Sequence, residues 1–167
     1  MELEIRRLRK HYGAKEVLKG ISFSVKGGRT MGFLGRNGAG KTTTLRILAG
    51  VFASDDGEVL LDGVPLNRKT VKVGYLPEER GLYSKIGILN QLTYIGQLKG
   101  MDRSSAADSA MHWLTEFELQ DALHKNLGTL SKGNQQKVQI IQAIIDAPDI
   151  LILDEPFSGL DPVNARL

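Results

Sequence analysis

The sequence predicts an α/β fold in which a mostly parallel sheet carries a small antiparallel β layer and a helical insertion. Two short apolar segments, residues 30–34 and 150–153, have the length and composition of buried parallel strands. The first runs into a glycine-rich loop and a helix, and the second ends in two acidic residues. Between about 80 and 130 the apolar residues take helical spacing, which indicates an insertion into the α/β core.

Composition limits the class of protein. The chain has 167 residues, 41% of them hydrophobic and 25% charged, which is typical of one globular domain, here 1–167. It holds no cysteine, and this excludes disulfides and thiolate metal sites. The net charge of +3 is too small to indicate nucleic-acid binding by itself. No apolar run approaches the roughly 20 residues that a membrane-spanning helix needs, so we expect any membrane role to depend on a partner.

The N-terminal part of the chain reads mainly as strands. Residues 2–8 alternate between apolar and charged side chains, the pattern of a half-buried strand. Turn signals at Gly13, Asp56-Gly57 and Asp62-Gly63 separate the segments that follow. A helix over 42–49 follows the glycine-rich loop and ends at Gly50. The expected strands are 2–8, 17–25, 30–34, 58–61 and 71–76.

The middle of the chain reads as helices. Apolar residues recur at intervals of three and four along three segments. These residues are Leu89, Leu92, Ile95 and Leu98; Ala106, Ala110, Trp113, Leu114 and Phe117; and Val138, Ile141, Ile144 and Ile145. We therefore expect a helical subdomain over 79–145, inserted between the core segments 1–78 and 146–167.

Residues 35–42 form a complete phosphate-binding loop between a predicted strand and a predicted helix, which is the required context. The glycines allow successive backbone N–H groups to face phosphate oxygens, and the helix dipole adds positive potential. In such loops the lysine bridges the β- and γ-phosphates, and the threonine hydroxyl binds Mg²⁺. The motif predicts a P-loop NTPase core. The expected nucleotide-binding residues are Gly35, Arg36, Asn37, Gly38, Ala39, Gly40, Lys41, Thr42 and Thr43.

A carboxylate pair follows the second apolar strand. In this class of fold, Asp154 and Glu155 would lie beside the phosphate loop, at the carboxyl end of a parallel strand. Asp154 would then hold Mg²⁺ through water, and Glu155 would polarise the attacking water. The alternative, an acid that caps the turn at Pro156, is the better interpretation only without a phosphate loop upstream.

A second glycine-containing motif, Leu-Ser-Lys-Gly-Asn-Gln-Gln-Lys, occupies residues 130–137. Ser131 is a good N-cap, and its hydroxyl and the free N–H groups at the start of the helix make a second anion site. A plain helix cap is the alternative. Two anion sites in one small domain are better explained if they belong to different nucleotides.

In this order the three segments resemble the nucleotide-binding domain of ATP-binding cassette (ABC) transporters, over nearly the whole chain. The second motif resembles the ABC signature, with Lys132 where glycine is usual and Asn134 where glutamine is usual. In the family, two domains pair head to tail, and the signature of one closes over the γ-phosphate held by the other. The resemblance therefore assigns Ser131, Lys132, Gly133 and Asn134 to a nucleotide on a second subunit.

Further positions take roles from the resemblance. Tyr12 stands where the family places an aromatic residue that stacks on adenine, a surface turn tyrosine being the alternative. Glu78 stands where the family has a glutamine, and its carboxylate would ligate Mg²⁺ or hold water. The dimer-interface loop of the family is matched by Ser158, Gly159, Leu160 and Asp161.

The resemblance implies an ATPase subunit of a transporter, with ATP and Mg²⁺ as its cofactors. The implied catalytic residues are Lys41, Glu78, Asp154 and Glu155, and the implied metal-binding residues are Thr42, Glu78 and Asp154. Such a subunit forms a homodimer, or pairs with another cassette, and drives transport by integral membrane subunits. Residues 77–83 look most like those of bacterial exporters. We expect a cytoplasmic protein, peripheral at the inner face of the cell membrane, with no nucleic-acid partner.

Two other function classes are open at this point. One is a soluble ABC-type ATPase that acts on ribosomes or DNA, and the other is a nucleotide-dependent dimerisation module without hydrolysis. The basic run of residues 6–11 is interpreted as a solvated strand face, because no aromatic residues interleave it. The family's core also continues past the interface loop to a histidine that contacts the γ-phosphate. We therefore expect this chain to be a C-terminally truncated piece of a longer protein.

Overall fold

The computed structural model describes residues 1–78 and 81–156. It divides into two compact units, Met1–Val71 and Lys72–Leu167, each of which is described by itself. The predicted division into a core and a helical subdomain over 79–145 stays a prediction.

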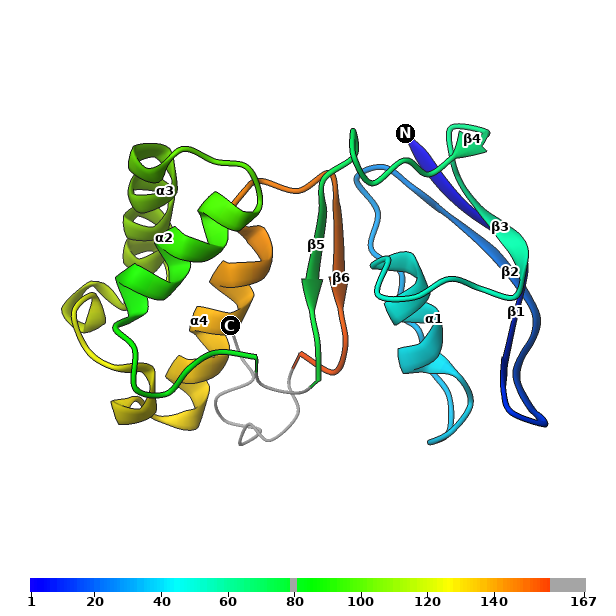
Figure 1. Ribbon diagram of the computed structural model, residues 1–167, viewed down its shortest axis with the longest axis horizontal. Helices are drawn as coiled ribbons and strands as arrows, with labels where there is room; N and C mark the ends of the chain where they lie inside the picture. Colours follow the sequence, from blue (N-terminus) through cyan, green and yellow to red (C-terminus); the bar gives the residue numbers. More distant parts are fainter. Residues whose placement is uncertain (79–80, 157–167) are drawn as a thin grey trace. The chain divides into compact units, whose positions relative to one another are not determined.

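The first unit is built on a four-stranded antiparallel sheet with the strand order β2-β1-β3-β4 (Figure 1). The strands are β1 (Glu2–Tyr12), β2 (Lys15–Lys26), β3 (Asp56–Leu61) and β4 (Val64–Pro65). The long β1 pairs with β2 along one edge and with β3 along the other, and the sheet buries Ile5, Leu8, Leu18 and Leu60. The predicted antiparallel layer is confirmed, with both N-terminal strands longer than expected.

Two glycine-containing sequences act differently in this sheet. Asp62 and Gly63 form the two-residue turn between β3 and β4 with φ angles of 50° and 79°, the positive pair that matches the twist of a tight hairpin. Gly57, predicted to lie in a turn, belongs to β3 instead. Its φ is 87°, and a Cβ there would lie 2.5 Å from the carbonyl oxygen of Arg6, so only glycine lets β3 pass this irregular part of β1.

Helix α1 (Lys41–Leu48) follows the glycine-rich loop and buries Thr44, Ile47 and Leu48. Arg68 closes its C-terminal end, since the guanidinium donates to the carbonyl oxygens of Ile47 at 2.7 Å and Leu48 at 3.2 Å. A cation at this end also complements the helix dipole. Burial lowers the pKa of the Arg68 guanidinium from its usual value, and the group keeps its charge at neutral pH.

Residues 30–34 form no strand, and the expectation of one there is wrong for this structure. A strand requires a neighbouring backbone with which to exchange hydrogen bonds, and this segment belongs to neither sheet of the described residues. Leu34 is 95% exposed and Met31 is 43% exposed. Phe33 alone makes a ring contact, with Phe23 of β2 at a centroid distance of 5.4 Å.

The second unit joins a parallel strand pair to three helices. The elements are β5 (Val73–Leu76), α2 (Ile88–Leu98), α3 (Arg103–Glu116), α4 (Lys132–Ile144) and β6 (Ile150–Leu153). Figure 1 shows α4 between the strand pair and the other two helices. The helices share one hydrophobic core, to which Leu92, Leu114 and Ile141 contribute fully buried side chains. The three predicted helices and the α/β class are thus confirmed.

Apolar side chains are exposed at two places in this unit, and the second contradicts a prediction. Leu98 is 69% exposed, because it follows the buried Leu92 by six residues, which rotates it by about 240° around α2. Strand β6 was expected to be buried on both faces, yet Leu151 is 45% and Leu153 is 37% exposed, against 6% for Ile152. Within the second unit, helix α4 packs on β5.

A buried amide shapes the loop that precedes α2. The Gln91 side chain, on the buried face of α2, accepts from the Tyr83 N–H at 2.8 Å and donates to the carbonyl oxygens of Tyr83 and Ile86, each at 2.8 Å. Every one of these bonds is to the main chain of the loop. The Tyr83 and Ile86 side chains are left 71% and 44% exposed.

Candidate functional site

The phosphate loop holds its own lysine across it. Lys41 Nζ donates to the carbonyl oxygen of Gly35 at 2.7 Å and to that of Arg36 at 3.3 Å. The Ala39 N–H also donates to the Arg36 carbonyl oxygen, at 3.1 Å, which closes the turn. The ammonium therefore lies over the loop already, where it can exchange carbonyl partners for phosphate oxygens.

Two glycines with positive φ give the loop its shape. Gly38 has φ 80° and Gly40 has φ 89°, a region that residues with a Cβ rarely adopt. A Cβ on Gly40 would also overlap the Leu18 side chain and lie 3.2 Å from the Val17 carbonyl oxygen, whereas one on Gly38 would meet nothing within 4 Å. Glycine is thus required at position 40 for two reasons: its positive φ and the close approach of Val17 and Leu18 of β2.

The start of α1 has the features of an anion site. Its N-cap is Gly40, no side chain caps it, and no acidic residue stands in its first turn. The Thr42 and Thr43 side chains are half-buried at this end. A loop of backbone N–H groups, a lysine ammonium and an uncapped helix start fit the phosphates of a nucleotide, and the Thr42 hydroxyl fits a Mg²⁺ ligand.

Three predicted acidic residues meet at one edge of the second unit. Strands β5 and β6 run parallel with Leu76 opposite Leu153, so Glu78 and the pair Asp154-Glu155 follow their strands at the same edge. The Asp154 N–H donates to the Leu76 carbonyl oxygen at 2.9 Å, which extends the ladder by one residue. Asp154 is 2% exposed, while Glu78 and Glu155 are exposed.

This edge does not make a complete metal site on its own. Among residues 1–78 and 81–156, no group of three or more His, Cys, Asp or Glu side chains could hold a metal ion. Mg²⁺ in nucleotide sites is held by one or two carboxylates together with phosphate oxygens and water, so Asp154 and Glu78 fit a metal brought in with a nucleotide.

The second glycine motif starts α4 in the same unit. Ser131 is the N-cap, as predicted, and its hydroxyl accepts from the Asn134 N–H at 3.3 Å. The Ser131 and Lys132 side chains are exposed. One turn along, Gln136 Nε2 donates to the Pro156 carbonyl oxygen at 2.9 Å, which connects the signature helix to the residue after Glu155.

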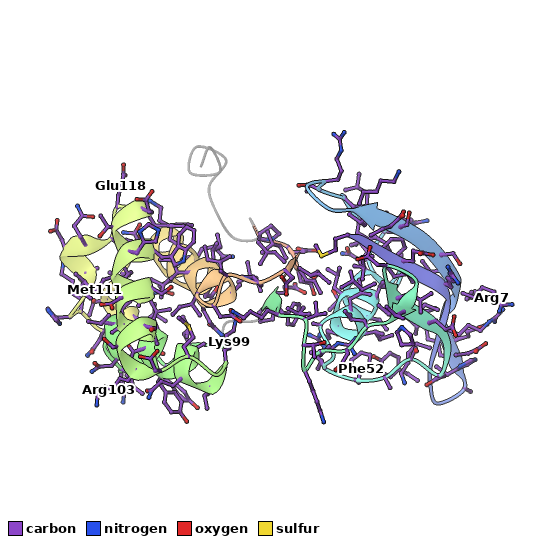
Figure 2. The ribbon with its side chains drawn as sticks, turned by 90° about the horizontal axis from the view of Figure 1, so that it is seen from above. Arg7, Phe52, Lys99, Arg103, Met111 and Glu118 are labelled. Atoms are coloured by element: carbon purple, nitrogen blue, oxygen red, sulfur yellow. The ribbon has the colours of Figure 1, made fainter. Side chains whose placement is uncertain are left out.

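Tyr12 ends β1 with 51% of its surface exposed, so a ligand can reach its side chain. The Phe52 ring lies at 6.3 Å from it, with an interplanar angle of 82°, in an edge contact. Our reading of the sequence missed Phe52, which follows α1, because it is far from Tyr12 along the chain and lies in no motif. Both aromatic residues belong to the first unit, in which Figure 2 labels Phe52.

The basic run of β1 is largely paired with acids of its own unit. Arg6 pairs with Glu4 at 2.5 Å, Arg9 with Glu16 at 2.7 Å and Lys10 with Asp55 at 2.6 Å. Cations that already have carboxylate partners are poor counterions for a nucleic-acid backbone. These pairs agree with a solvated strand face, and the absence of a nucleic-acid partner stays a prediction.

The predicted residues fall on both units. Tyr12 and the phosphate loop belong to the first, and Glu78, the signature motif and Asp154-Glu155 belong to the second. The predicted dimer-interface loop, Ser158, Gly159, Leu160 and Asp161, lies outside the described residues. No helix in the described part of the chain is long and apolar enough to cross a membrane.

Comparison with known proteins places this geometry in context. The family model described as "ABC transporter" matches residues 18–158. The chain is 48% identical over 166 residues to an uncharacterized ABC transporter ATP-binding protein of Methanocaldococcus jannaschii, a match that covers 99% of this chain and 60% of the relative. It is 35% identical to the Nod factor export ATP-binding protein I of Paraburkholderia xenovorans, over 99% of this chain and 56% of that protein. The chain thus spans somewhat over half the length of these relatives.

Solved structures agree with the sequence relatives. A structure described as the ATP binding subunit of an ABC transporter superposes with a TM-score of 0.83 at 31% identity, over 99% of this chain and 70% of that one. A second, a putative ABC transporter ATP-binding protein from Pyrococcus furiosus, gives a TM-score of 0.80 at 32% identity, over 98% of this chain and 80% of that one.

Proposed function

Because this chain belongs to the family of ABC transporter ATP-binding proteins, we propose that its complete protein binds and hydrolyses Mg-ATP to drive transport through separate membrane subunits. The observation that carries the proposal is the start of α1, where a full phosphate loop meets an uncapped helix end and Lys41 already lies over the loop. Membership of the family supports ATP hydrolysis as the reaction, and the geometry of this loop supports it as the site that binds the phosphates.

The proposal assigns a role to each predicted residue. The loop 35–43 binds the phosphates, Lys41 holds the β- and γ-phosphate oxygens, and Thr42 with Asp154 holds the metal. Bound Mg²⁺ would neutralise charge on the phosphate oxygens. Glu155, which is exposed and directly follows the buried Asp154, orients or deprotonates the attacking water. Glu78, at the same edge, holds water or a metal-bound water.

Assembly follows the same logic. The start of α4, where Ser131 and Lys132 are exposed and Gly133 and Asn134 are half-buried, binds the γ-phosphate held by a second subunit, and Ser158–Asp161 takes part in that interface. Export is the direction we favour, because relatives include a Nod factor export protein and a linearmycin resistance ATP-binding protein of Bacillus subtilis. The subunit would then act on the inner face of the membrane through its partners.

The test separates binding from hydrolysis in the complete protein. Glu155→Gln should abolish phosphate release and keep ATP bound, because it removes the base and none of the phosphate contacts. With Mg-ATP the variant should form a dimer in size-exclusion chromatography, and without nucleotide it should elute mainly as a monomer. Unchanged phosphate release would remove Glu155 from the mechanism, and a monomer at saturating ATP would contradict the role of Ser131 and its neighbours.

A further inference from the structure

A carboxylate from another part of the first unit fixes the residues directly before Tyr12. Asp55 Oδ1 accepts from Lys10 Nζ at 2.6 Å, and Oδ2 accepts from the His11 N–H at 2.6 Å. Oδ2 also lies 3.2 Å from His11 Nδ1, and the Asp55 N–H donates to the Arg9 carbonyl oxygen at 3.0 Å. One residue thus bonds three successive residues of β1; we name Asp55, Lys10 and His11 the Asp55 clamp.

The end of β1 needs such support. The pairing of β1 with β3 stops at Arg9 opposite Asp56, so residues 10–12 have no strand partner on that side. On the other side the pairing with β2 shifts register between Lys10 and His11, and the turn after Tyr12 begins with Gly13 at φ 57°. A strand end with one irregular neighbour is prone to fray. The Asp55 clamp takes the place of the missing ladder.

The clamp is charged and is continuous with the aromatic contact of Tyr12. The Lys10 side chain, by its hydrogen bond, is the main cause that lowers the pKa of Asp55 to about 2, so the carboxylate is fully ionised at neutral pH. Lys10 Nζ also lies 5.7 Å from the centroid of the Phe52 ring, within the range of a cation–π contact. Phe52 in turn makes a T-shaped ring contact with Tyr12.

From this arrangement we infer that Asp55 is a positioning residue for nucleotide recognition: through Lys10, His11 and Phe52 it holds the Tyr12 ring in place to stack on the base of the bound nucleotide. The inference rests on the proposed function, specifically on Tyr12 as the base-stacking residue. Asp55 touches no phosphate-loop residue in any described hydrogen bond or ion pair, so it acts on the base end of the ligand and not on the phosphate end.

The experiment compares two ligands that share the phosphate end. Binding of ATP and of inorganic triphosphate is measured for the complete protein and for its Asp55→Ala, Tyr12→Ala and Asp55→Ala/Tyr12→Ala variants. Stacking of a base on an aromatic side chain accounts for a roughly 5- to 100-fold change in affinity, so Tyr12→Ala should weaken ATP binding by that factor. Asp55→Ala should weaken it roughly three- to tenfold, with triphosphate binding unchanged for both.

The double variant distinguishes positioning from a general structural role. If Asp55 acts through Tyr12, Asp55→Ala should have no further effect on ATP binding once Tyr12 is alanine. Asp56→Ala, which removes the neighbouring carboxylate without touching residues 10–12, is the matched control and should bind ATP as the unaltered protein does. Asp55→Asn keeps an acceptor for the His11 N–H and should fall between the unaltered protein and Asp55→Ala.

Each remaining outcome overturns the inference in a distinguishable way. Equal loss of ATP and triphosphate binding in Asp55→Ala, or the same loss with and without Tyr12, would show a structural role. Unchanged ATP binding in Asp55→Ala would show that Tyr12 needs no support. Unchanged ATP binding in Tyr12→Ala would remove the stacking role and the inference together, whereas the ATPase proposal would stand on the phosphate loop. If the complete protein without substitutions does not bind triphosphate, that result would contradict the ATPase proposal itself.

Discussion

The N-termini of α1 and α4 are both predicted to bind phosphate, and they are built in opposite ways. At α1 the N-cap is Gly40, with positive φ and no side-chain cap, and a lysine lies over the entry. At α4 the N-cap is Ser131, whose own hydroxyl accepts the Asn134 N–H. Helix α3 is a third case, since the Asp102 carboxylate at its N-cap accepts the Ser105 N–H at 3.0 Å.

The difference concerns what each helix start requires in the absence of a ligand. An uncapped start leaves its N–H groups to an incoming anion, and it must be held by other contacts, here glycine conformation and the approach of β2. A start capped by a hydroxyl is stable alone and can still present its remaining groups. A start capped by a carboxylate already has its anion. We therefore expect α1 to bind phosphate strongly, α4 to assist, and α3 to bind none.

The largest effect is expected at Gly40. Gly40→Ala forces a Cβ into positive φ and into Leu18, and should destabilise the protein by roughly 2–5 kcal/mol with loss of ATP binding. Gly38→Ala has the same φ problem in open space and should cost only about 1–2 kcal/mol. Chemical denaturation of both variants measures the difference. Equal destabilisation would mean that contact with β2 does not fix the open end of α1.

The next effect is that of Lys41→Ala on affinity. A charge-assisted hydrogen bond is worth about 1.5–3 kcal/mol, so ATP binding should weaken by roughly 10- to 100-fold, with little change in stability. A fluorescent ATP analogue is the probe, and Lys26→Ala, an exposed lysine in β2, is the control. An affinity equal to that of the control would show that α1 does not receive the phosphates.

At α4 the expected effect is smaller and divided between two readouts. Ser131→Ala removes the cap and should lower the free energy of unfolding by about 1 kcal/mol. Binding of ATP to the monomer should be unchanged, whereas ATP-dependent dimer formation of Glu155→Gln should weaken when Ser131→Ala is added. Analytical ultracentrifugation with and without Mg-ATP tests this. Weaker ATP binding by the monomer would make α4 a primary site like α1.

The smallest effect is expected at α3 and depends on pH. The Ser105 side chain and N–H hold the pKa of Asp102 below its usual value of 3.8. The stabilisation from this ionised cap is therefore fully present above about pH 4, and it is lost as the pH falls through the lowered pKa of the folded protein. Asp102→Asn should flatten the pH dependence of the unfolding midpoint in that acidic range. An unchanged slope would mean that the carboxylate charge adds nothing to the cap.

The differences between the N-termini of α1, α3 and α4 could be predicted in part from the sequence. The phosphate loop and the Ser131 cap are local patterns, in which the residues that act together are neighbours in the chain. The helices of the second unit could be predicted equally well, because apolar residues recur at helical spacing within each of them. Leu92, Leu114 and Ile141, one from each helix, contribute to the shared core.

What could not be predicted depends on contacts between distant segments. Nothing near Asp55 indicates that it bonds residues 9–11, because that contact exists only once β3 lies beside β1. Residues 30–34 have the composition of a strand, yet composition does not supply a pairing neighbour. Likewise the hydrophobic pattern of β6 fits burial on both faces, yet Leu151 and Leu153 are exposed.

The main-chain hydrogen bonds of Gln91 have an evolutionary consequence. Because that amide bonds only backbone atoms of the loop, the loop keeps its conformation whichever side chains stand at 83 and 86. The backbone shape of the loop and its surface chemistry can therefore change independently in evolution. Substitutions at the two exposed positions change the side chains on the surface, while the buried Gln91 keeps the backbone conformation. The side chains at 83 and 86 can therefore change by point substitution while Gln91 keeps the backbone of the loop in place.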